Sequence, residues 1–458
     1  MFDKVLIANR GEIAVRIIRS CRELGIGTVC AYSSADQDSL AVRMADEAVR
    51  IGPGPSARSY RNGSALLYAC ARTGATAIHP GYGFLSEDPA FAELCEQVGV
   101  TFIGPRSEQI RLMGDKIAAR RAMRAAGVPV LPGSFEAVTD DHQARCVAAD
   151  IGYPVMVKAT AGGGGRGIAM AKNPEELTEA FTATRAAAQS LYADNRVYIE
   201  RFVRGARHIE VQVLGDDHGN LVHLGERDCS VQRQRQKLIE ESPAPGISSE
   251  LRERLCAAAV AGAGSVGYRS AGTVEFLVDD EGEPYFIEMN TRLQVEHPVT
   301  EARSGLDLVA WMIRVAAGER LDVAQDDIDL DGHAIEIRVN AEDAARDWAG
   351  SSGRIDRVRL PDGPGIRVDT HIFDGYHVPP FYDSLLAKII VSAPDRRQAL
   401  ELLSTALDDT ACEGITTNLD LHRALIRHPD FRAGRHRLDL VERLLTESTL
   451  TTMGAGKP

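Results

Sequence analysis

Residues 288–297 read Glu-Met-Asn-Thr-Arg-Leu-Gln-Val-Glu-His, and this stretch carries the strongest indication of the fold. Two carboxylates, an amide, an arginine and a histidine among so few apolar residues are not typical of a core strand. Upstream, Thr273–Leu277 alternates polar and apolar residues, and the acidic, glycine-containing segment Asp279–Glu283 lies between the two stretches. Alternation on both sides of a turn-forming segment predicts a β-hairpin.

The predicted hairpin brings acidic side chains together. With the loop centred on Glu281 and Gly282, Glu275 lies opposite Glu288, and the strand period of two keeps Asn290 on the face of Glu288. Two carboxylates and an amide oxygen are ligands that a hard divalent cation such as Mg²⁺ accepts. The pattern therefore predicts a metal site, with a solvated hairpin face carrying unrelated acidic residues as the alternative.

Length and composition exclude several classes of protein. The chain has 458 residues, which favours three domains of about 150 residues. Its net charge of −13 argues against a nucleic-acid or anionic-membrane partner. Eight cysteines are scattered without CxxC pairs, which predicts reduced thiols, no zinc site and a cytoplasmic location. The chain starts on a predicted strand without a signal peptide, and no apolar run reaches the roughly 18 residues of a membrane span.

The first hundred residues alternate strands with helices, which predicts a parallel, Rossmann-like sheet. The turn at residues 9–12 is not a GxGxxG motif, so a dinucleotide site is disfavoured. The loop His79–Glu87 is rich in turn formers and is either a connector or the rim of a substrate site. The predicted strands are Lys4–Ala8, Thr28–Tyr32, Ala75–Ile78 and Val100–Ile103.

The centre of the chain contains a glycine-rich segment at residues 162–165. It follows an apolar strand that ends near Lys158 and precedes another predicted strand, Ile168–Ala171. Successive glycines are costly to order, so they favour a backbone that folds over an anion, with Lys158 adding positive charge. The segment predicts a phosphate-binding lid; a flexible linker is the alternative, and a P-loop is excluded by the missing GK[ST].

Two polar runs lie between the glycines and the hairpin. His208 and Glu210 alternate with apolar residues on a predicted strand, whose polar face either binds a ribose or meets solvent. Glu226–Lys237 contains four cations and two acids. As a strand leading back to the hairpin it would supply positive charge for an oxyanion, whereas as a surface helix it would be ordinary. Cys229 within it is interpreted as structural.

Taken together, the motifs resemble those of the biotin carboxylase family, the ATP-grasp subunits of biotin-dependent carboxylases. The resemblance extends from Lys4 to about Leu445. It rests on six segments in the order of that family: Ile7–Ala14, His79–Glu87, Met113–Lys116, Lys158–Gly167, Glu226–Lys237 and Glu288–Pro298.

The resemblance implies a mixed α/β and α+β protein. A Rossmann-like domain is expected at residues 1–114 and an ATP-grasp domain at 115–332, with a lid at about 131–203. A β-rich C-terminal domain is expected at 333–447, before a flexible tail at 448–458.

The resemblance also implies a role for each motif. The ATP site is expected to comprise Lys116, Lys158, Gly163, Gly164, Gly165, Glu200, Val203, His208, Gln232 and Leu277. The ligands of Mg²⁺ or Mn²⁺ are expected to be Glu275, Glu288 and Asn290. The site of bicarbonate and biotin is expected to comprise Lys237, Arg292, Gln294, Val295, Arg338 and Tyr82, with Glu296 as the base.

The implied activity is that of an ATP-dependent ligase. Glu296, kept ionised by the neighbouring Arg292, deprotonates bicarbonate, which attacks ATP to give carboxyphosphate. Arg338 then stabilises the biotin enolate, and N-carboxybiotin, ADP and phosphate are formed. Two departures from the family pattern are Ala161, at the start of the glycine run, and Arg235, where many relatives have histidine or asparagine.

The expected partners follow from what the chain lacks. It contains no Met-Lys-Met biotinylation segment, so the biotin carrier protein and the carboxyltransferase are expected to be separate chains. Acetyl-CoA carboxylase, in fatty acid biosynthesis, is one expected parent enzyme. The sequence leaves the final carboxyl acceptor open between acetyl-CoA, propionyl-CoA, another acyl-CoA and pyruvate. Arg16, Arg19 and Glu23 match the region through which relatives form homodimers, with a solvated helix face as the alternative.

Three other functions are weighed against this one. A different ATP-grasp ligase has no reason to keep Arg338 or the loop His79–Glu87. A non-catalytic nucleotide-binding regulator would have lost the acid–base residues, which are all present here. An oxidoreductase built on the first domain is disfavoured by its first turn.

Overall fold

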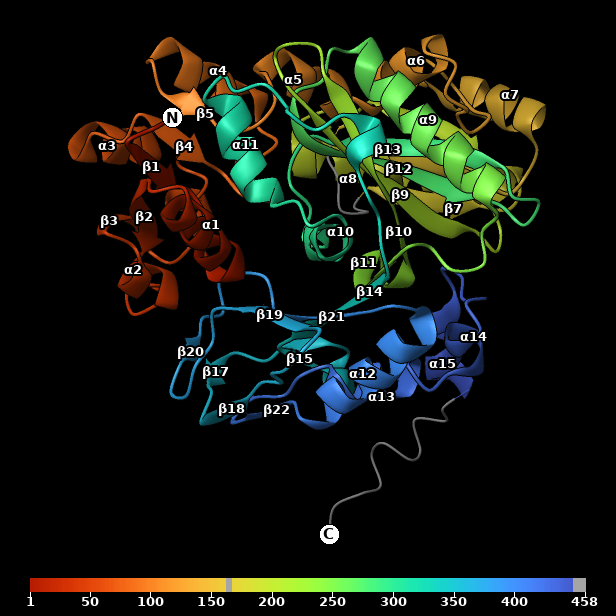
Figure 1. Cartoon of the computed structure of the whole chain (residues 1–458). Helices are drawn as coiled ribbons and strands as arrows, with labels where there is room; N and C mark the ends of the chain where they lie inside the picture. Colours follow the sequence, from red (N-terminus) through yellow and green to blue (C-terminus); the bar gives the residue numbers. More distant parts are fainter. Residues whose placement is uncertain (162–166, 448–458) are drawn as a thin grey trace.

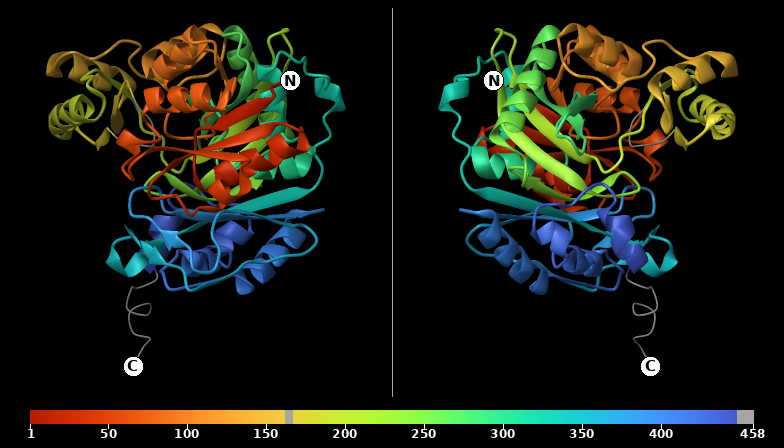
Figure 2. Two further views of the ribbon diagram at one scale, coloured as in Figure 1. Left: turned by 90° about the vertical axis from the view of Figure 1, so that its left-hand side faces the viewer. Right: turned by 90° about the vertical axis from the view of Figure 1, so that its right-hand side faces the viewer.

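The computed structural model describes residues 1–161 and 167–447. In Figure 1 the N-terminal region (red and orange) lies beside the central region (yellow and green), and the C-terminal region (blue) lies below both. Both side views in Figure 2 show the C-terminal region as a layer beneath the rest. The lid glycines 163–165 and the predicted tail fall outside the described residues, and the domain bounds stay predictions.

A five-stranded parallel sheet forms the N-terminal region, in the order β3-β2-β1-β4-β5. The order reverses direction between β1 and β4, as in doubly wound folds, so the prediction of a Rossmann-like sheet is confirmed. The strands are β1 (Lys4–Ile7), β2 (Gly27–Ser33), β3 (Glu47–Gly52), β4 (Ala77–His79) and β5 (Thr101–Phe102). The connections contain α1 (Gly11–Glu23), α2 (Leu40–Met44), η1 (Ser56–Arg58), α3 (Gly63–Thr73), α4 (Pro89–Gln97) and α5 (Ser107–Gly114).

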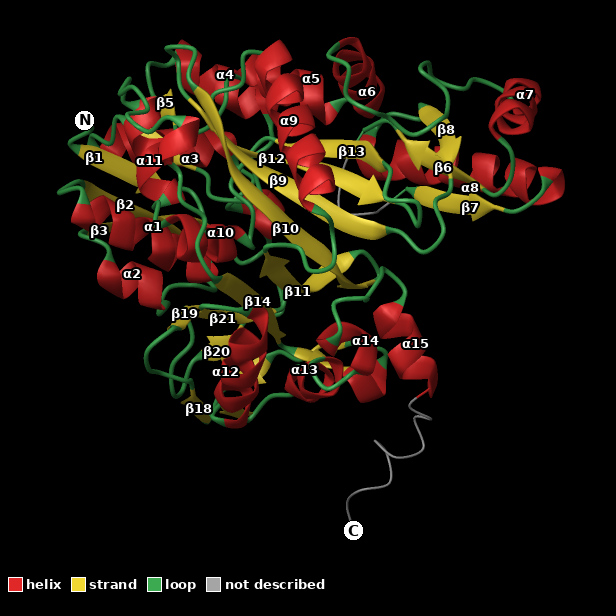
Figure 3. Cartoon of the chain, turned by 45° about the vertical axis from the view of Figure 1, so that its right-hand side comes forward, coloured by secondary structure: helices red, strands yellow, loops and turns green. Residues whose placement is uncertain are grey.

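The strands before and after the glycine-rich segment, β6 and β7, form a small antiparallel sheet with β8, in the order β7-β6-β8. Helix α8 (Pro174–Tyr192) begins directly after Asn173, whose side chain caps it by accepting a hydrogen bond from the Glu176 N–H. Figure 3 shows this sheet with α7 and α8 beside it. The other elements are α6 (Lys116–Ala125), α7 (Asp141–Ile151), β6 (Val155–Ala159), β7 (Ile168–Ala171) and β8 (Val197–Arg201).

An eight-stranded antiparallel sheet joins the central and C-terminal regions, in the order β13-β12-β9-β10-β11-β14-β21-β19. The sheet is continuous across residue 332, because β11 pairs with β14. Its strands are β9 (Arg207–Gly215), β10 (Leu221–Arg233), β11 (Gln236–Ser242), β12 (Ser270–Val278), β13 (Pro284–Asn290), β14 (His333–Asn340), β19 (Ile366–Thr370) and β21 (Leu385–Ala393).

The predicted hairpin is formed by β12 and β13. Glu275 lies opposite Glu288, as predicted. Closer to the turn the predicted register is wrong by one residue, because Phe276 pairs with Phe286 and leaves Ile287 as an extra residue in β13. Such a β-bulge inserts one residue into one strand, and sequence alternation alone does not reveal it.

Helix α10 (His297–Ser304) packs on the inner part of the large sheet, against β10, β11, β14 and β21. Helix α11 (Leu308–Ala316) contacts both α1 and β12. Together α1 and α11 therefore lie between the five-stranded sheet and the eight-stranded sheet (Figure 1). Helix α9 (Ser249–Ser265) covers β9, β10 and β12. Among the described helices none combines the length and the apolar character needed to cross a bilayer.

The C-terminal region adds short strands and four helices to the large sheet. All eight cysteines of the chain are free thiols, and Cys229 is buried in β10. The remaining elements are η2 (Gln325–Asp327), β15 (Glu342–Asp343), η3 (Ala344–Arg346), β16 (Ala349–Gly350), β17 (Gly353–Arg354), β18 (Arg357–Arg359), β20 (His377–Val378), α12 (Arg396–Asp408), β22 (Ala411–Glu413), α13 (Leu419–Leu425), α14 (Pro429–Arg432) and α15 (Leu440–Glu447).

Candidate active site

A cavity of about 740 Å³ lies where the N-terminal region, the small sheet and the large sheet meet. Every described residue that the sequence predicts as part of the site lines it. These residues are Tyr82, Lys116, Lys158, Glu200, Val203, His208, Gln232, Lys237, Glu275, Leu277, Glu288, Asn290, Arg292, Gln294, Val295, Glu296 and Arg338. The structure therefore brings them together in one site, although their individual roles stay predictions.

One end of the cavity is apolar. Met156 and Ile168 from the small sheet, Leu277 and Ile287 from the hairpin and Leu438 near the C-terminus line it. An apolar slot of this kind accepts a flat aromatic ring. Leu438 was missed by the sequence reasoning, because no local motif links it to a strand that lies more than 150 residues earlier.

The polar face of β9 is buried, so the alternative that it meets solvent is wrong. Gln232 Nε2 donates a hydrogen bond to His208 Nδ1 at 2.8 Å, and His208 Nε2 lies 3.1 Å from Glu275 Oε2. Burial by itself lowers the pKa of His208, but the charge and hydrogen bond of Glu275 together with the charge of Glu210 raise this pKa above its ordinary value.

Two lysines also line the cavity, and each pairs with a carboxylate. Lys116 is at the start of α6, where Asp115 caps the helix, and its ammonium pairs with Glu288. Burial lowers the pKa of Lys116, but the charge and hydrogen bond of Glu288 together with the charges of Glu200 and Glu275 raise it above its ordinary value, so the ammonium stays protonated. Lys158 at the end of β6 pairs with Glu200, which also accepts a 2.9 Å hydrogen bond from Arg120.

The hairpin presents the predicted metal ligands on one side of the cavity. Glu275 Oε1 accepts hydrogen bonds from Asn290 Nδ2 at 2.8 Å and from Gln294 Nε2 at 3.0 Å. Burial by itself raises the pKa of Glu275, but the charges of Lys237 and His208 bring it well below its ordinary value, so the carboxylate is ionised. Two facing carboxylates and an amide oxygen are hard donors, and they fit a Mg²⁺ or Mn²⁺ ion.

Glu296 is completely buried just before α10, and its carboxylate lies between two cations. Lys237 Nζ donates to Oε1 at 2.5 Å and Arg338 Nη2 donates to Oε2 at 2.8 Å. Burial raises the pKa of Glu296, but the charges of Lys237, Arg338 and Arg227 outweigh it, and the pKa lies well below its ordinary value. The carboxylate is therefore ionised at neutral pH, as a general base must be.

Arg292 does not make the ion pair that the sequence reasoning expected. Its Nε donates to Glu87 Oε2 at 2.8 Å, and the neighbouring Thr291 N–H donates to Glu87 Oε1 at 3.1 Å. Glu296 is instead held by Lys237 and Arg338. The chain turns between Asn290 and Glu296, so Arg292 faces the loop His79–Glu87, which lines the cavity and is therefore a rim.

Of four buried residues in or beside the site, Glu240, Lys388 and Glu12 were missed, and Glu210 was considered only as part of a ribose-binding or solvated face. Glu210 accepts from Lys237 at 2.6 Å, and Glu240 accepts from Arg338 at 2.6 Å. Lys388 of β21 is fully buried, donates to the Val295 carbonyl at 2.8 Å and pairs with Glu12 at 3.1 Å. A lysine inside the apolar strand Leu385–Ala393 is a signal that could have been used.

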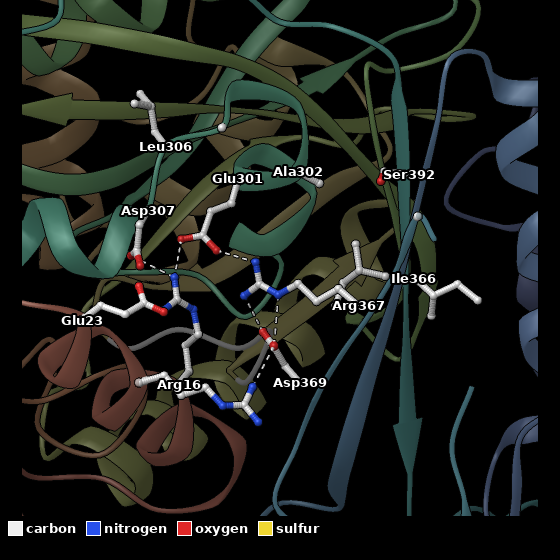
Figure 4. Close-up of a pocket in the computed structure, with 14 residues that line it drawn as sticks. Arg16, Glu23, Glu301, Ala302, Leu306, Asp307, Ile366, Arg367, Asp369 and Ser392 are labelled. Carbon is white, nitrogen blue, oxygen red and sulfur yellow. Dashed lines mark hydrogen bonds and ion pairs between the residues drawn. The ribbon is translucent and has the colours of Figure 1, made fainter. Parts of the chain in front are cut away.

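A second pocket, on the far side of α1 from its own sheet, contains the residues expected at a dimer interface (Figure 4). Arg16 lies between Glu301 and Asp307, at 2.9 and 2.8 Å. Arg16 is buried, so a simple solvated face is wrong for this residue. Arg19 and Glu23 also line the pocket, and the Arg19 side chain is 45% exposed.

Three family models match the chain. "Biotin carboxylase, N-terminal domain" matches residues 1–110, "Carbamoyl-phosphate synthase L chain, ATP binding domain" matches 115–324, and "Biotin carboxylase C-terminal domain" matches 336–443. Together the three matches account for most of the chain, in the order that the resemblance predicts.

Curated relatives are similar over nearly the full length. The biotin carboxylase of Halalkalibacterium halodurans is 52% identical, over 95% of this chain and 96% of the relative. That of a Nostoc species is 49% identical, over 97% and 99%. A pyruvate carboxylase subunit of Methanothermobacter thermautotrophicus is 49% identical, over 95% and 88%.

Solved structures are equally similar. The biotin carboxylase domain dimer of Hydrogenobacter thermophilus 2-oxoglutarate carboxylase, in complex with MgADP, ADP and bicarbonate, gives a TM-score of 0.94 at 46% identity, over 97% of this chain and 98% of that chain. A nucleotide complex of Campylobacter jejuni biotin carboxylase gives 0.95 at 44% identity, over 97% and 99%.

Proposed function

This chain belongs to the biotin carboxylase family, and on that premise we propose a role for each group in the cavity. The protein is an ATP-dependent ligase that uses MgATP and bicarbonate to carboxylate biotin, with ADP and phosphate as the other products. The observation that carries the assignment of residues is the buried, ionised Glu296 between Lys237 and Arg338, in the same cavity as the paired carboxylates of the hairpin.

We propose that the apolar end binds adenine and that the lysines bind the phosphates. Leu277 and Val203 supply apolar contacts to the purine, and His208 and Gln232 lie where a ribose would follow. Lys116 and Lys158 extend from there toward Glu288 and Glu200, so an incoming phosphate would replace those carboxylates as the partner of each ammonium. When bound at Glu275, Glu288 and Asn290, Mg²⁺ or Mn²⁺ would neutralise charge on the phosphates.

Glu296 is proposed to take the proton of bicarbonate. Its depressed pKa keeps it ionised, and Lys237 and Arg338 fix both of its oxygens. Lys237, Arg292, Gln294 and the Val295 N–H are proposed to hold the bicarbonate next to it. Holding two anions together is the main catalytic problem in forming carboxyphosphate, and fixed cations solve it by electrostatic stabilisation.

Carboxyphosphate is proposed to break down to CO₂ and phosphate, and this phosphate removes the proton of the biotin ureido nitrogen. Arg338 is proposed to stabilise the resulting enolate, which then attacks the CO₂. A guanidinium keeps its charge at any relevant pH and presents several N–H donors in fixed geometry. Tyr82 lines the same part of the cavity, and its hydroxyl is held by Glu12. Biotin would therefore enter beside the rim formed by the loop His79–Glu87.

The partners are proposed from the family and from the second pocket. The biotin carrier and the carboxyltransferase are proposed to be separate chains of a biotin-dependent carboxylase such as acetyl-CoA carboxylase. A homodimer is proposed through the surface of Arg16, Arg19 and Glu23, because the Hydrogenobacter domain is a dimer. A cytoplasmic location is proposed from the eight free cysteines, which suit a reducing compartment.

A single assay tests the activity. We expect ATP hydrolysis that requires bicarbonate and is stimulated by free biotin. A different ATP-grasp ligase would hydrolyse ATP without responding to biotin, and a nucleotide-binding regulator would bind ATP without turnover.

A further inference from the structure

Glu240 on β11 lies behind Arg338 and does not line the cavity. It is completely buried. Its Oε1 accepts a hydrogen bond from Arg338 Nε at 2.6 Å and lies 2.5 Å from Arg338 Nη2. The same Nη2 donates to Glu296 Oε2 at 2.8 Å. Two carboxylates therefore share one edge of the guanidinium, and one of them is the proposed base.

A third carboxyl group faces Glu240. In the pairing of β11 with β14, Glu240 lies directly opposite Glu336, and both are fully buried. Among the described residues, Glu240 Oε2 and both oxygens of Glu336 have no hydrogen-bond partner. Two facing carboxyls in a dry environment do not both ionise, because like charges repel. The one that contacts Arg338 is the one that carries the charge.

The titration of the pair agrees with this geometry. Burial raises the pKa of Glu336 well above its ordinary value, and its charged neighbour Lys388 does not offset burial. Burial raises the pKa of Glu240 to about 7, against the opposing charge of Arg338. The charged or titratable groups that face Glu240 are Lys237 on its own strand, Cys229 on β10, Glu336 and Arg338 on β14 and Glu296 before α10.

We propose that Glu240 is a positioning residue for Arg338. It holds the guanidinium by Nε and Nη2, and it competes with Glu296 for Nη2. The proposal rests on the function proposed above, because it matters only if Arg338 meets the biotin enolate and Glu296 is the base. Without the charge of Glu240, Arg338 pairs with Glu296 alone. The arginine then moves away from its place, and the base binds a proton less readily.

The test compares Glu240→Gln with Glu241→Gln. Glutamine keeps the size of the side chain and removes the charge. Glu241 is the next residue on the same strand and is also buried, but it pairs with His333 at 2.8 Å and with Arg396 at 2.8 Å, away from the cavity. Glu241→Gln therefore matches the loss of a buried charge without touching Arg338, and its biotin-stimulated turnover should stay close to that of the wild type.

For Glu240→Gln at pH 8 we expect kcat of biotin-stimulated ATP hydrolysis to fall by about 10- to 100-fold, as when a catalytic group is displaced by about 1 Å. The KM for ATP should stay within about twofold of the wild type, because Lys116 and Lys158 pair with Glu288 and Glu200 and not with Glu240. The deficit should shrink as the pH falls below about 7, because Glu240 of the wild type is then protonated and equally unable to hold Arg338.

Three results would overturn the proposal: turnover equal to that of Glu241→Gln, a deficit that does not change with pH, or a rise in the KM for ATP that accounts for the loss. If Glu240→Gln does not fold, Glu240→Asp is tested instead, because it keeps the charge on a shorter side chain. Its kcat should fall by less than the fall expected for Glu240→Gln, with a wild-type KM for ATP. Full wild-type turnover of Glu240→Asp would contradict the proposal. If the wild type shows no biotin-stimulated ATPase, the proposed function fails instead, so the two failures are distinguishable.

Discussion

Replacement of Glu296 by glutamine is expected to abolish turnover while ATP still binds. The carboxylate accepts hydrogen bonds from Lys237 Nζ at 2.5 Å and from Arg338 Nη2 at 2.8 Å, and an amide of the same size occupies the same place but keeps only one of these two acceptors. The amide cannot accept a proton from bicarbonate. Because a general base contributes about 10²–10⁴-fold to a rate, we expect kcat to fall by at least about 100-fold. ATP affinity should change little, since Lys116 and Lys158 pair with other carboxylates.

The same substitution should cost less stability than the loss of a buried ion pair usually does. Removing one partner costs about 3–5 kcal/mol when the other charge is left alone. Here Lys237 keeps Glu210 at 2.6 Å and Glu275 at 3.0 Å, and Arg338 keeps Glu240. Neither cation is left without a partner, so the free energy of unfolding should fall by less than about 3 kcal/mol. Urea unfolding of both proteins measures this difference.

The assay is bicarbonate-dependent phosphate release from ATP with free biotin present, combined with calorimetric titration of ATP. Glu210→Gln serves as a control, because it also removes a carboxylate from Lys237 but leaves the proposed base. It should keep more turnover than Glu296→Gln, although Arg227 loses a partner at 2.6 Å. A Glu296→Gln enzyme with kcat within about tenfold of the wild type would refute the assignment of the base. Weaker ATP binding with normal turnover would refute it as well.

Two further predictions concern the metal and the response to pH. Glu288→Gln should raise the Mg²⁺ concentration needed for half-maximal activity, and excess Mg²⁺ should restore part of the rate; an unchanged Mg²⁺ titration would contradict the ligand assignment. Burial lowers the folded-state pKa of His79 and of His371 to about 3 each. An unfolded histidine binds a proton below about pH 6.5, whereas these two buried histidines stay neutral. Their contribution to the free energy of unfolding is therefore complete above about pH 6.5. It is lost as the pH falls, by about 1.4 kcal/mol per pH unit for each histidine. Urea unfolding at several values between pH 7.5 and 5 should show this slope, and His371→Gln should reduce it; an identical slope in the variant would count against the burial of a neutral imidazole.

Local structure near the site could be predicted from the sequence because it depends on neighbouring residues. The turn at Asp279–Glu283 sets the hairpin, and the strand period then places Glu275 opposite Glu288. The start of α8 is equally local, because Asn173 satisfies the backbone N–H of Glu176 three residues later. The bulge at Ile287 was not predictable, because an extra residue in one strand leaves the alternation of its neighbours nearly unchanged.

The ion pairs of the site depend instead on how distant segments meet. Arg292 pairs with Glu87, 205 residues earlier, and Arg338 reaches Glu296 from a strand 42 residues later. Proximity in sequence suggested that Arg292 pairs with Glu296, but the chain between them turns and directs the two side chains to different partners. The resemblance to the family predicted which residues line the cavity. Which of these residues pair with one another depends on how the sheets are placed relative to each other, and the sequence does not give that placement.

The pairing explains how a chain with a net charge of −13 can bind two anionic substrates. Lys116, Lys158, Lys237, Arg292 and Arg338 each contact at least one carboxylate. A cluster of buried cations without such partners would be unstable, because each unpaired charge costs several kcal/mol to desolvate. With the roles proposed above, substrate anions would exchange with carboxylates already in place, and a metal ion bound at the hairpin would balance the carboxylates that lose their lysines. On this argument the acids around the cavity are as necessary for binding ATP and bicarbonate as the cations are.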